Sequence, residues 1–414
     1  MSGLRIVRLA NFVTPVSGGL RTALRQLGIG YRAAGHHPVL IVPGAVADDR
    51  ETEQGRVITL PGRLLPRTGG YRVLLDRPRL AEVLAGLRPD RLEVSDRSTL
   101  RWTGDWARRQ GVPAAMVSHE SLDGLLRTWG LTESLARRTA DRLNSATARD
   151  HQAVICTTAW AAAEFHRVGA RNVVRAPLGV DLEQHHPRHH NAAARAHYAR
   201  PGELLLVMCS RLSPEKRPER ALDALAELRR RGVPAVLVVA GEGPLRARLT
   251  ARATTEGLPV RFTGHLGRSA GLTGSLTGSL TEPLSGSRPG SLPGSLPDVS
   301  GGSLAGLLAS ADVVLAPGPI ETFGLAALEA LACGTPVAVS ASSALPQLIG
   351  DAGAVAADTG PGFADAVQRL LARPDADRRA AARTCAEQYG WDRAVQRFLA
   401  AHRAPVAVPE AVAP

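Results

Sequence analysis

Two basic residues follow an apolar segment in the second half of the chain. Arg211 and Lys216 lie in CSRLSPEKRPERALDAL, residues 209–225, where a short apolar run gives way to a polar loop and then to a helical pattern. Lys216 is the only lysine among 414 residues. Arginine offers a planar fork and lysine a compact point charge, and both neutralise phosphate oxygens. Helix capping explains Ser213 but not two cations, so the pattern favours a diphosphate site.

Two carboxylates occur in PGPIETFGLAALEALACGTPV, residues 317–337. Glu321 follows an apolar run, and Glu329 comes eight residues later inside an Ala/Leu-rich helical pattern. A carboxylate in such a helix is costly unless it accepts hydrogen bonds, and sugar and ribose hydroxyls are suitable donors. Between the two, residues 323–325 begin the predicted helix, whose first amides are free to hold phosphate oxygens. Two surface carboxylates on one helix would fit these apolar neighbours poorly.

Paired glycines follow the first predicted strand. Gly18 and Gly19 lie in PVSGGLRTAL, residues 15–24, at the start of a helical pattern. Glycines allow close approach of the backbone, and a helix N-terminus attracts anions. No G-x-G-x-x-G follows, so the dinucleotide fingerprint is absent. A tight turn without a ligand explains this feature equally well.

The elements that must position these residues alternate regularly. Apolar runs separated by amphipathic stretches indicate buried parallel sheets covered by helices. In the first half, we expect strands at Leu4–Leu9, Pro38–Val42, Arg91–Val94, Ala114–Ser118 and Val154–Cys156, and helices at Leu20–Ala34, Arg79–Leu87, Glu133–Leu143 and Ala159–Val168. In the second half, we expect strands at Leu204–Cys209, Ala235–Ala240, Val260–Phe262, Val313–Ala316 and Val337–Val339, and helices at Arg220–Arg230, Leu245–Glu256, Leu304–Ala309 and Leu325–Ala332.

The alternation predicts two doubly wound α/β domains. The expected parts are a first domain at 1–180, a linker at 181–202, a second domain at 203–388, a last helix at 389–403 and a disordered tail at 404–414. Within the second domain, residues 269–303 repeat Gly-Ser-Leu steps with scattered prolines and read as a flexible insertion. The linker carries four histidines that match no standard metal motif, so a solvated linker is favoured over a metal site.

Composition narrows the function further. The formal net charge of +12 suits anionic partners such as nucleotide phosphates or an anionic membrane face. Aromatic residues make up only 4% and do not alternate with basic ones, so no nucleic acid partner is expected. No run of 18 apolar residues occurs, and four scattered cysteines favour a reducing compartment. A cytoplasmic protein is therefore expected, with peripheral contact at the inner membrane face as a further expectation.

Together the motifs resemble the nucleotide-binding half of glycosyltransferase family 4. The likeness rests on residues 209–225, on GEGPL at 241–245 and on the Glu321/Glu329 pair, and it extends over most of the chain. It implies a GT-B fold, in which two Rossmann-like domains face each other across a cleft and a C-terminal helix crosses back to the first domain. It also implies a retaining hexosyltransferase that takes a nucleotide-diphosphate sugar as donor and needs no metal or other cofactor.

The resemblance also assigns roles to residues. Arg211 and Lys216 are expected to hold the departing diphosphate, and Glu321 and Glu329 to contact the donor sugar and the ribose. His119, in VSHESL after a first-domain strand, matches a histidine near the transferred carbon, although a histidine there is more often structural. The expected catalytic residues are Arg211, Lys216, Glu321 and His119, and the expected donor-binding residues are Gly18, Gly19, Gly241, Glu242, Phe323, Gly324, Leu325 and Glu329.

The expected reaction is transfer of a hexose from GDP-mannose or a UDP-sugar to a glycan, lipid or small-molecule acceptor. The wording SGGLRTAL and APLGVD resembles actinobacterial mannosyltransferases of the family, which favours GDP-mannose. Two alternatives stay open, namely a sugar-nucleotide epimerase of GT-B type and a non-catalytic sugar-nucleotide-binding subunit. An arginine-rich group in the first domain fits a lipid acceptor on an anionic membrane or an ordinary solvated surface equally well, and it comprises Arg63, Arg67, Arg72, Arg77 and Arg79.

Overall fold

Mostly apolar segments form the strands of two large sheets in the computed structural model, which describes residues 3–13, 18–65, 70–119, 121–128, 130–266 and 303–403. The first sheet has the order β10-β9-β8-β7-β1-β2-β4-β3, and every pair is parallel except β3 with β4. Its strands are β1 (Arg5–Leu9), β2 (His37–Gly44), β3 (Asp48–Thr52), β4 (Gly55–Pro61), β7 (Arg91–Val94), β8 (Ala114–Ser118), β9 (Ala153–Cys156) and β10 (Val173–Arg175).

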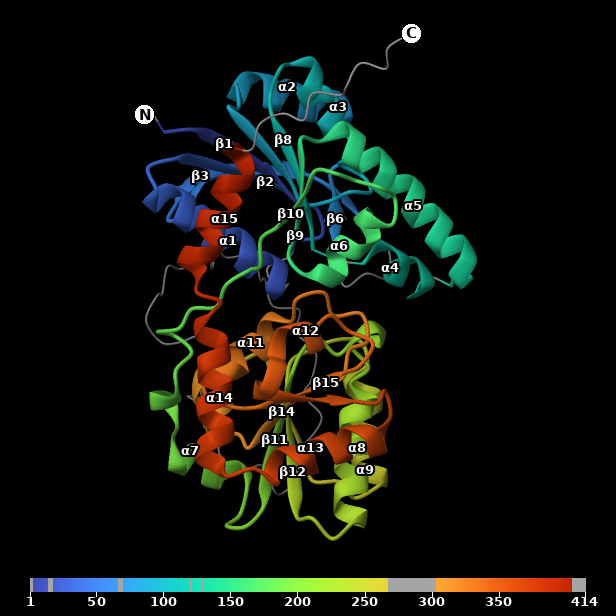
Figure 1. Ribbon diagram of the computed structural model, residues 1–414, viewed down its shortest axis with the longest axis vertical. Helices are drawn as coiled ribbons and strands as arrows, with labels where there is room; N and C mark the ends of the chain where they lie inside the picture. The colour runs from blue at the N-terminus through green and yellow to red at the C-terminus, as the bar shows by residue number, and fades with distance from the viewer. Residues whose placement is uncertain are drawn as a thin grey trace, which may run out of the picture.

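Helices cover both faces of this first sheet (Figure 1). The apolar residues of α2 and α3 pack with one face, and those of α1 and of the C-terminal helix α15 pack with the other. Burial on both faces explains why β8 is buried along its whole length and apolar up to its last residue, Ser118. The helices are α1 (Gly19–Ala33), α2 (Arg77–Leu87), α3 (Trp102–Arg109), α4 (Leu122–Thr128), α5 (Glu133–Asp150), α6 (Ala159–His166) and α15 (Trp391–Arg403).

The second sheet is parallel throughout, in the order β13-β12-β11-β14-β15-β16. Helices α8, α9 and α13 pack on one face, and α10, α11 and α14 on the other. The strands are β11 (Leu204–Cys209), β12 (Ala235–Ala240), β13 (Val260–Gly264), β14 (Val313–Ala316), β15 (Val337–Ser340) and β16 (Gly353–Ala356). The helices are α8 (Glu219–Arg230), α9 (Arg246–Thr255), α10 (Leu304–Ser310), α11 (Leu325–Ala332), α12 (Pro346–Ile349), α13 (Gly360–Leu371) and α14 (Asp375–Glu387).

The chain crosses between the two halves twice, and the crossings are bonded to each other. The Val180 amide donates to the Tyr389 carbonyl at 2.7 Å, and Val180 forms a parallel bridge with Gly390. After the second crossing, α15 runs along the first domain and packs against α1 (Figure 1). The predicted fold class is therefore confirmed, including the C-terminal helix that returns to the first domain.

Several elements were not predicted. Residues 181–202 include a 3-10 turn (Pro187–His189) and α7 (Ala192–Tyr198), so this segment is partly helical. Strand β3 is fully polar and lies at the sheet edge, where pairing with β4 forms it despite low β-propensity. A small antiparallel pair, β5 (Arg63–Leu64) with β6 (Arg72–Val73), projects after β4.

The expected insertion and tail fall largely outside the described residues, which omit 267–302 and 404–414. Ser303, the last residue of that expected insertion, caps α10 by accepting from the Gly306 amide at 3.0 Å. None of the helices in the described segments has the length and apolar content that a membrane crossing requires.

Candidate active site

Arg211 and Lys216 occupy the loop between β11 and α8. Because parallel strands end at one edge of their sheet, this loop lies beside the loop after β14. The Lys216 ammonium donates a hydrogen bond to Glu321 Oε2, and the two side chains are 23% and 26% exposed. Lys216 ends a short 3-10 turn (Pro214–Lys216), and Arg217 after it adopts a left-handed backbone with φ +46°. The structure thus brings together two expected catalytic residues that lie 105 positions apart.

Arg211 is held from two sides. Its Nη2 donates to Glu215 Oε1 at 2.9 Å, and its Nη1 donates to the hydroxyl of Tyr71 at 2.6 Å. Tyr71 belongs to the first domain, and the Arg211 guanidinium also lies 5.6 Å from the centre of the Tyr71 ring. Sequence reasoning missed Tyr71 because no motif marks a lone tyrosine between β5 and β6.

The loop after β14 presents the start of α11. Gly324 has φ +70°, a backbone conformation that favours glycine, and a Cβ at this position would lie 2.4 Å from Leu345 Cδ2. The Ala344 amide donates to the Glu321 carbonyl at 2.9 Å and fixes the loop from the other side. Phe323 packs edge-on against Tyr389, and Glu329 is 5% exposed within α11. The first turn of α11 therefore points its amides to the edge where Lys216 and Glu321 meet.

The first domain meets this loop at two places. A Cβ at Gly19 would lie 3.6 Å from Leu325 Cδ1, so the start of α1 approaches the start of α11. A Cβ at Gly124 in α4 would lie 3.2 Å from Ile320 Cγ2, directly before Glu321. Gly18 is the exposed residue before α1. At both of these places, a glycine lies on the first-domain side.

Gly241 and Glu242 follow β12, the neighbour of β11. A Cβ at Gly241 would lie 2.0 Å from the Ser210 carbonyl oxygen, so the chain there passes directly against the loop that carries Arg211. Gly241 also bridges to Gly264 at the end of β13. Glu242 forms an ion pair with Arg246. Gly241 and Glu242 lie at the same sheet edge as Arg211 and Lys216. Because β12 flanks β11 on the side away from β14, they lie beside these cations and not between them and α11.

His119 lies directly after β8 at the carboxyl edge of the first sheet. Its Nε2 is hydrogen bonded to Ser95 Oγ at 3.1 Å. Loss of hydration by burial lowers the pKa of His119 to about 4, so the imidazole is neutral at pH 7. A neutral imidazole acts by hydrogen bonding rather than by charge.

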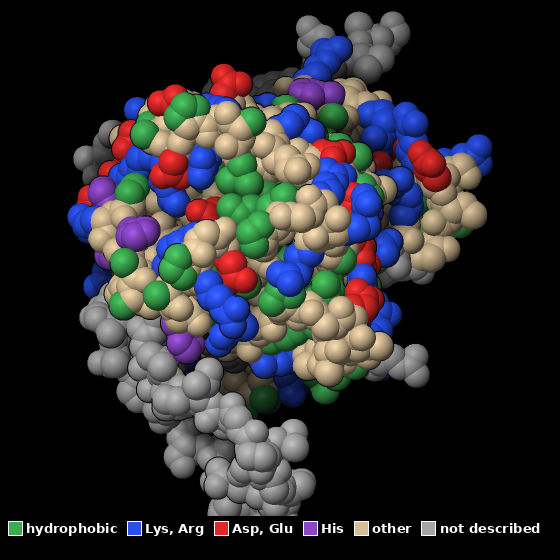
Figure 2. Space-filling view, turned by 90° about the horizontal axis from the view of Figure 1, so that it is seen from below, with side chains coloured by type: hydrophobic (Ala, Val, Ile, Leu, Met, Phe, Trp, Pro, Cys, Tyr) green, Lys and Arg blue, Asp and Glu red, His purple; other side chains and the backbone are tan. Residues whose placement is uncertain are grey.

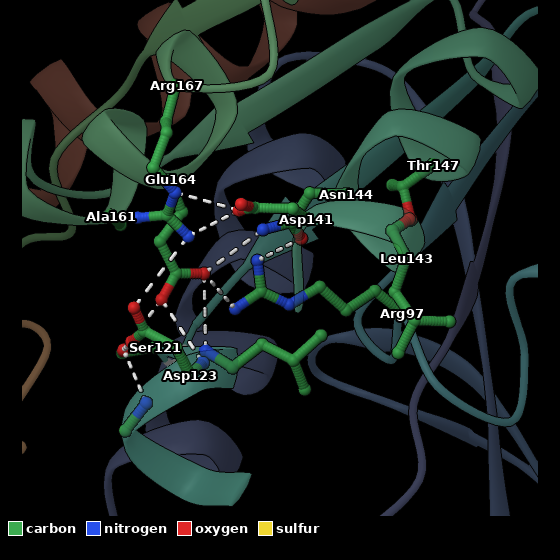
Figure 3. Close-up of polar contacts among 12 residues, drawn as sticks. Arg97, Ser121, Asp123, Asp141, Leu143, Asn144, Thr147, Ala161, Glu164 and Arg167 are labelled. Carbon is green, nitrogen blue, oxygen red and sulfur yellow. Dashed lines mark hydrogen bonds and ion pairs between the residues drawn. The ribbon is translucent and has the colours of Figure 1, made fainter. Parts of the chain in front are cut away.

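A buried carboxylate anchors the chain that follows His119. Glu164 of α6 is 4% exposed and accepts from the Leu122 amide at 3.2 Å, while Ser121 Oγ lies 2.6 Å from its other oxygen. Arg97 Nη2 lies 3.3 Å from the same carboxylate. Figure 3 shows the side chains of Arg97 and Ser121 directed at Glu164. Neither Glu164 nor Arg97 was predicted, because a single Glu in an alanine-rich helix carries no sequence signal.

The arrangement can hold an anion between two domains. Arg211, Lys216 and the α11 amides supply positive charge and donors on one side, and glycines permit close approach on the other. Within the described ranges, no group of three or more His, Cys, Asp or Glu side chains is placed to bind a metal ion.

Comparisons with known proteins show which family this chain resembles. Residues 18–179 match the family described as "Glycosyl transferase 4-like domain", and residues 191–270 and 292–373 match "Glycosyl transferases group 1". A Mycobacterium tuberculosis protein named "GDP-mannose-dependent alpha-(1-6)-phosphatidylinositol dimannoside mannosyltransferase" is 47% identical over 96% of this chain and 95% of its own. A GDP-mannose-dependent alpha-mannosyltransferase of Mycolicibacterium smegmatis is 26% identical over 81% of this chain and 79% of its own.

Solved structures of other proteins have a similar fold. Sucrose-phosphate synthase from Thermosynechococcus elongatus matches with a TM-score of 0.73 and 20% identity over 97% of this chain and 98% of its own. An Anabaena protein crystallised with UDP and glucose matches with a TM-score of 0.67 and 16% identity, over 96% of this chain and 98% of its own.

Proposed function

The chain belongs to glycosyltransferase family 4, and from that premise we propose that it transfers mannose from GDP-mannose to a phosphatidylinositol-linked mannoside. The predicted enzyme class, a hexosyltransferase of GT-B fold, is confirmed by the matched families and the 47% identical relative. The donor and acceptor are proposed from that relative's name, because its likeness covers 96% of this chain. The observation that carries the proposal is the meeting of Lys216, Glu321 and Arg211 at one sheet edge.

The proposed mechanism uses protein groups where other transferases use a metal. The diphosphate of the donor lies beside Arg211 and Lys216, with the amides of 323–325 adding hydrogen bonds. The bond from the mannose anomeric carbon to the diphosphate oxygen breaks, and the departing GDP keeps the electron pair. The acceptor hydroxyl oxygen bonds to that carbon from the side on which GDP leaves and gives its proton to the departing diphosphate oxygen, so configuration is retained.

The remaining residues have positioning roles in this proposal. Glu321 accepts hydrogen bonds from the mannose hydroxyls and Glu329 from the ribose. Gly18 and Gly19 bring the start of α1 close to the distal phosphate, and Gly241 and Glu242 border the donor on the β12 side. His119 donates or accepts a hydrogen bond near the transferred carbon in its neutral form.

A lipid-linked acceptor requires access to a membrane surface. The β5–β6 pair carries exposed Leu64, and Leu75 nearby is 48% exposed. Arg63, Arg77 and Arg79 beside them are also exposed. Exposed apolar side chains with arginines close to them in the chain favour binding to anionic bilayers, and we propose that this first-domain surface binds one. At the end of the second domain, by contrast, basic and acidic side chains are interspersed (Figure 2).

Vesicle sedimentation tests the membrane contact. We expect Leu64→Glu combined with Leu75→Glu to reduce pelleting with phosphatidylglycerol vesicles, while Val355→Glu, at an exposed apolar residue of the second domain, leaves it unchanged. Equal pelleting of all three proteins would contradict this surface assignment.

Transfer assays with EDTA present test the proposed reaction. The purified chain is incubated with GDP-mannose or UDP-glucose and a phosphatidylinositol dimannoside acceptor, and products are identified by mass and by the anomeric coupling constant of the new linkage. We expect mannosylated lipid of retained configuration from GDP-mannose alone. Conversion of the donor to a free epimeric sugar would favour the epimerase alternative. Binding of GDP without turnover would favour the non-catalytic subunit.

A further inference from the structure

Tyr71 contacts Arg211 across the space between the two domains. Its hydroxyl accepts a hydrogen bond from Arg211 Nη1 at 2.6 Å, and its ring faces the guanidinium at 5.6 Å. The two residues are 140 positions apart in the chain. This hydrogen bond joins a first-domain side chain directly to a cation of the candidate site.

The position of Tyr71 is built into the first domain. Three residues after Tyr71, the Leu74 amide donates to Asn11 Oδ1 at 2.9 Å, and Asn11 is fully buried. Asn11 in turn donates to Asp96 Oδ2 at 3.0 Å, which ties it to the loop after β7. Phe12, with φ +59°, packs edge-on against the Tyr71 ring at 6.1 Å. A non-glycine residue with this backbone is uncommon, so the surroundings impose the conformation that holds the ring.

The contact leaves Arg211 able to bind a second group. A guanidinium has five N–H donors, and Tyr71 and Glu215 each use one. Tyr71 is an uncharged partner, so it orients the guanidinium without cancelling its charge. The Arg211 side chain is 40% exposed, and an exposed arginine loses considerable side-chain entropy when it is fixed on a ligand. A partner that fixes it beforehand reduces this cost.

We infer that Tyr71 is a positioning residue for the donor diphosphate, which orients Arg211 from the opposite domain before the nucleotide binds. This inference rests on the proposed role of Arg211 in binding the donor. It also makes the donor site depend on both domains, because a first-domain residue orients a nucleotide-binding cation of the second domain.

Calorimetric titration of the full chain with GDP and with UDP tests the inference. Tyr71→Phe removes the hydroxyl and keeps the ring, and we expect it to weaken binding of the preferred nucleotide by about tenfold, since hydrogen bonds to charged groups are of this strength. The matched control is Tyr198→Phe, at a tyrosine of α7 whose ring packs on His197. We expect this control to bind as the unaltered chain does.

A double-mutant cycle separates positioning from general damage. If Tyr71 acts through Arg211, Tyr71→Phe changes binding by less than about twofold in an Arg211→Lys background. Unchanged binding by Tyr71→Phe alone, or an equal loss in both backgrounds, would overturn the inference. Failure of the unaltered chain to bind either nucleotide would overturn the proposed function and this role together. Binding of UDP in place of GDP would show that the donor is a UDP-sugar, and the double-mutant cycle would then be measured with UDP.

Discussion

At the scale of single residues, the candidate site depends on charges that are already balanced before a donor binds. Lys216 bonds to Glu321, and Arg211 bonds to Glu215. Each pair is only partly buried, so its contribution to folding stability is small. The pairing instead keeps the side chains at the edge where a diphosphate and its sugar would lie. Substitutions here should therefore alter transfer much more than stability.

Lys216→Ala tests this separation. We expect kcat for transfer to fall by about 100-fold or more, because a cation that meets charge on the leaving group is removed. The melting temperature should change by only a few degrees, because the Lys216–Glu321 ion pair keeps contact with solvent (Lys216 is 23% exposed) and contributes little to folding stability. Arg230→Ala, at a largely exposed arginine of α8, is the control and should keep full activity. Near-normal turnover by Lys216→Ala would refute the phosphate role.

At the scale of elements, buried polar groups tie helices to the first sheet. Glu93 of β7 accepts from Arg8 Nε at 3.0 Å and from the Tyr31 hydroxyl at 2.7 Å, and His402 Nε2 of α15 lies 3.1 Å away. These contacts lower the pKa of Glu93 well below its usual value in spite of burial, which opposes them. One carboxylate thus joins β1, α1, β7 and the helix that returns from the second domain.

Glu93→Gln should loosen this junction. It removes the charge that balances buried Arg8, and breaking such a pair typically costs about 3–5 kcal/mol. We expect the urea midpoint to fall sharply, and Asp90→Asn, at an exposed carboxylate that bonds the Arg5 amide, to have a much smaller effect. Equal midpoints for the two variants would show that Glu93 does not carry the junction.

His151, which follows α5, should make stability depend on pH. Burial lowers its pKa to about 4, below the value of about 6.5 for an unfolded chain. The unfolded state therefore binds a proton first, and stability falls as pH drops from about 6.5 towards 4. The expected loss from this residue is about 2 kcal/mol between pH 7.5 and pH 5. Urea unfolding at both pH values should show a smaller loss for His151→Gln, but not for His166→Gln at an exposed histidine of α6.

At the scale of the whole molecule, the paired crossings determine how the two domains face each other. A Cβ at Gly179 would lie 2.6 Å from the Trp391 Cα, which is backbone of the other crossing. Because both crossings are joined at Val180 and Tyr389, a change in one moves the other. The site between the domains, including the contact of Tyr71 with Arg211, depends on this geometry.

Gly179→Ala should therefore disturb transfer without touching a site residue. We expect a lower kcat, a raised KM for the donor, and a changed radius of gyration by small-angle scattering, with a stability cost of about 1–3 kcal/mol. Gly86→Ala in α2 is the control, because a Cβ there meets no atom within 4 Å. Normal scattering and kinetics for Gly179→Ala would argue against a role of the crossings in domain placement.

Local sequence patterns predict the fold class, which the structure confirms, and they predict that residues at the strand ends form the site. Apolar periodicity predicts strands such as β8 and β11 because burial on both faces demands continuous apolar side chains. Parallel strands end at one edge, so Lys216 and Glu321 could be expected to meet although 105 positions separate them. Glycines could be expected at positions 241 and 324, because the backbone there passes close to other segments of the chain. The domain boundaries and the roles of the site residues remain predictions.

Other contacts carry no local sequence pattern and are known from the folded structure alone. Tyr71, Glu164 and Arg97 each lie in a segment whose sequence is ordinary, and their importance comes from partners that folding brings near. Strand β3 is polar and forms only because β4 offers a partner at the sheet edge. Periodicity records which face of an element is buried, but it does not record which domain faces which. That relation follows from the two crossings near Val180 and Gly390, where backbone bonds rather than side-chain types set the geometry.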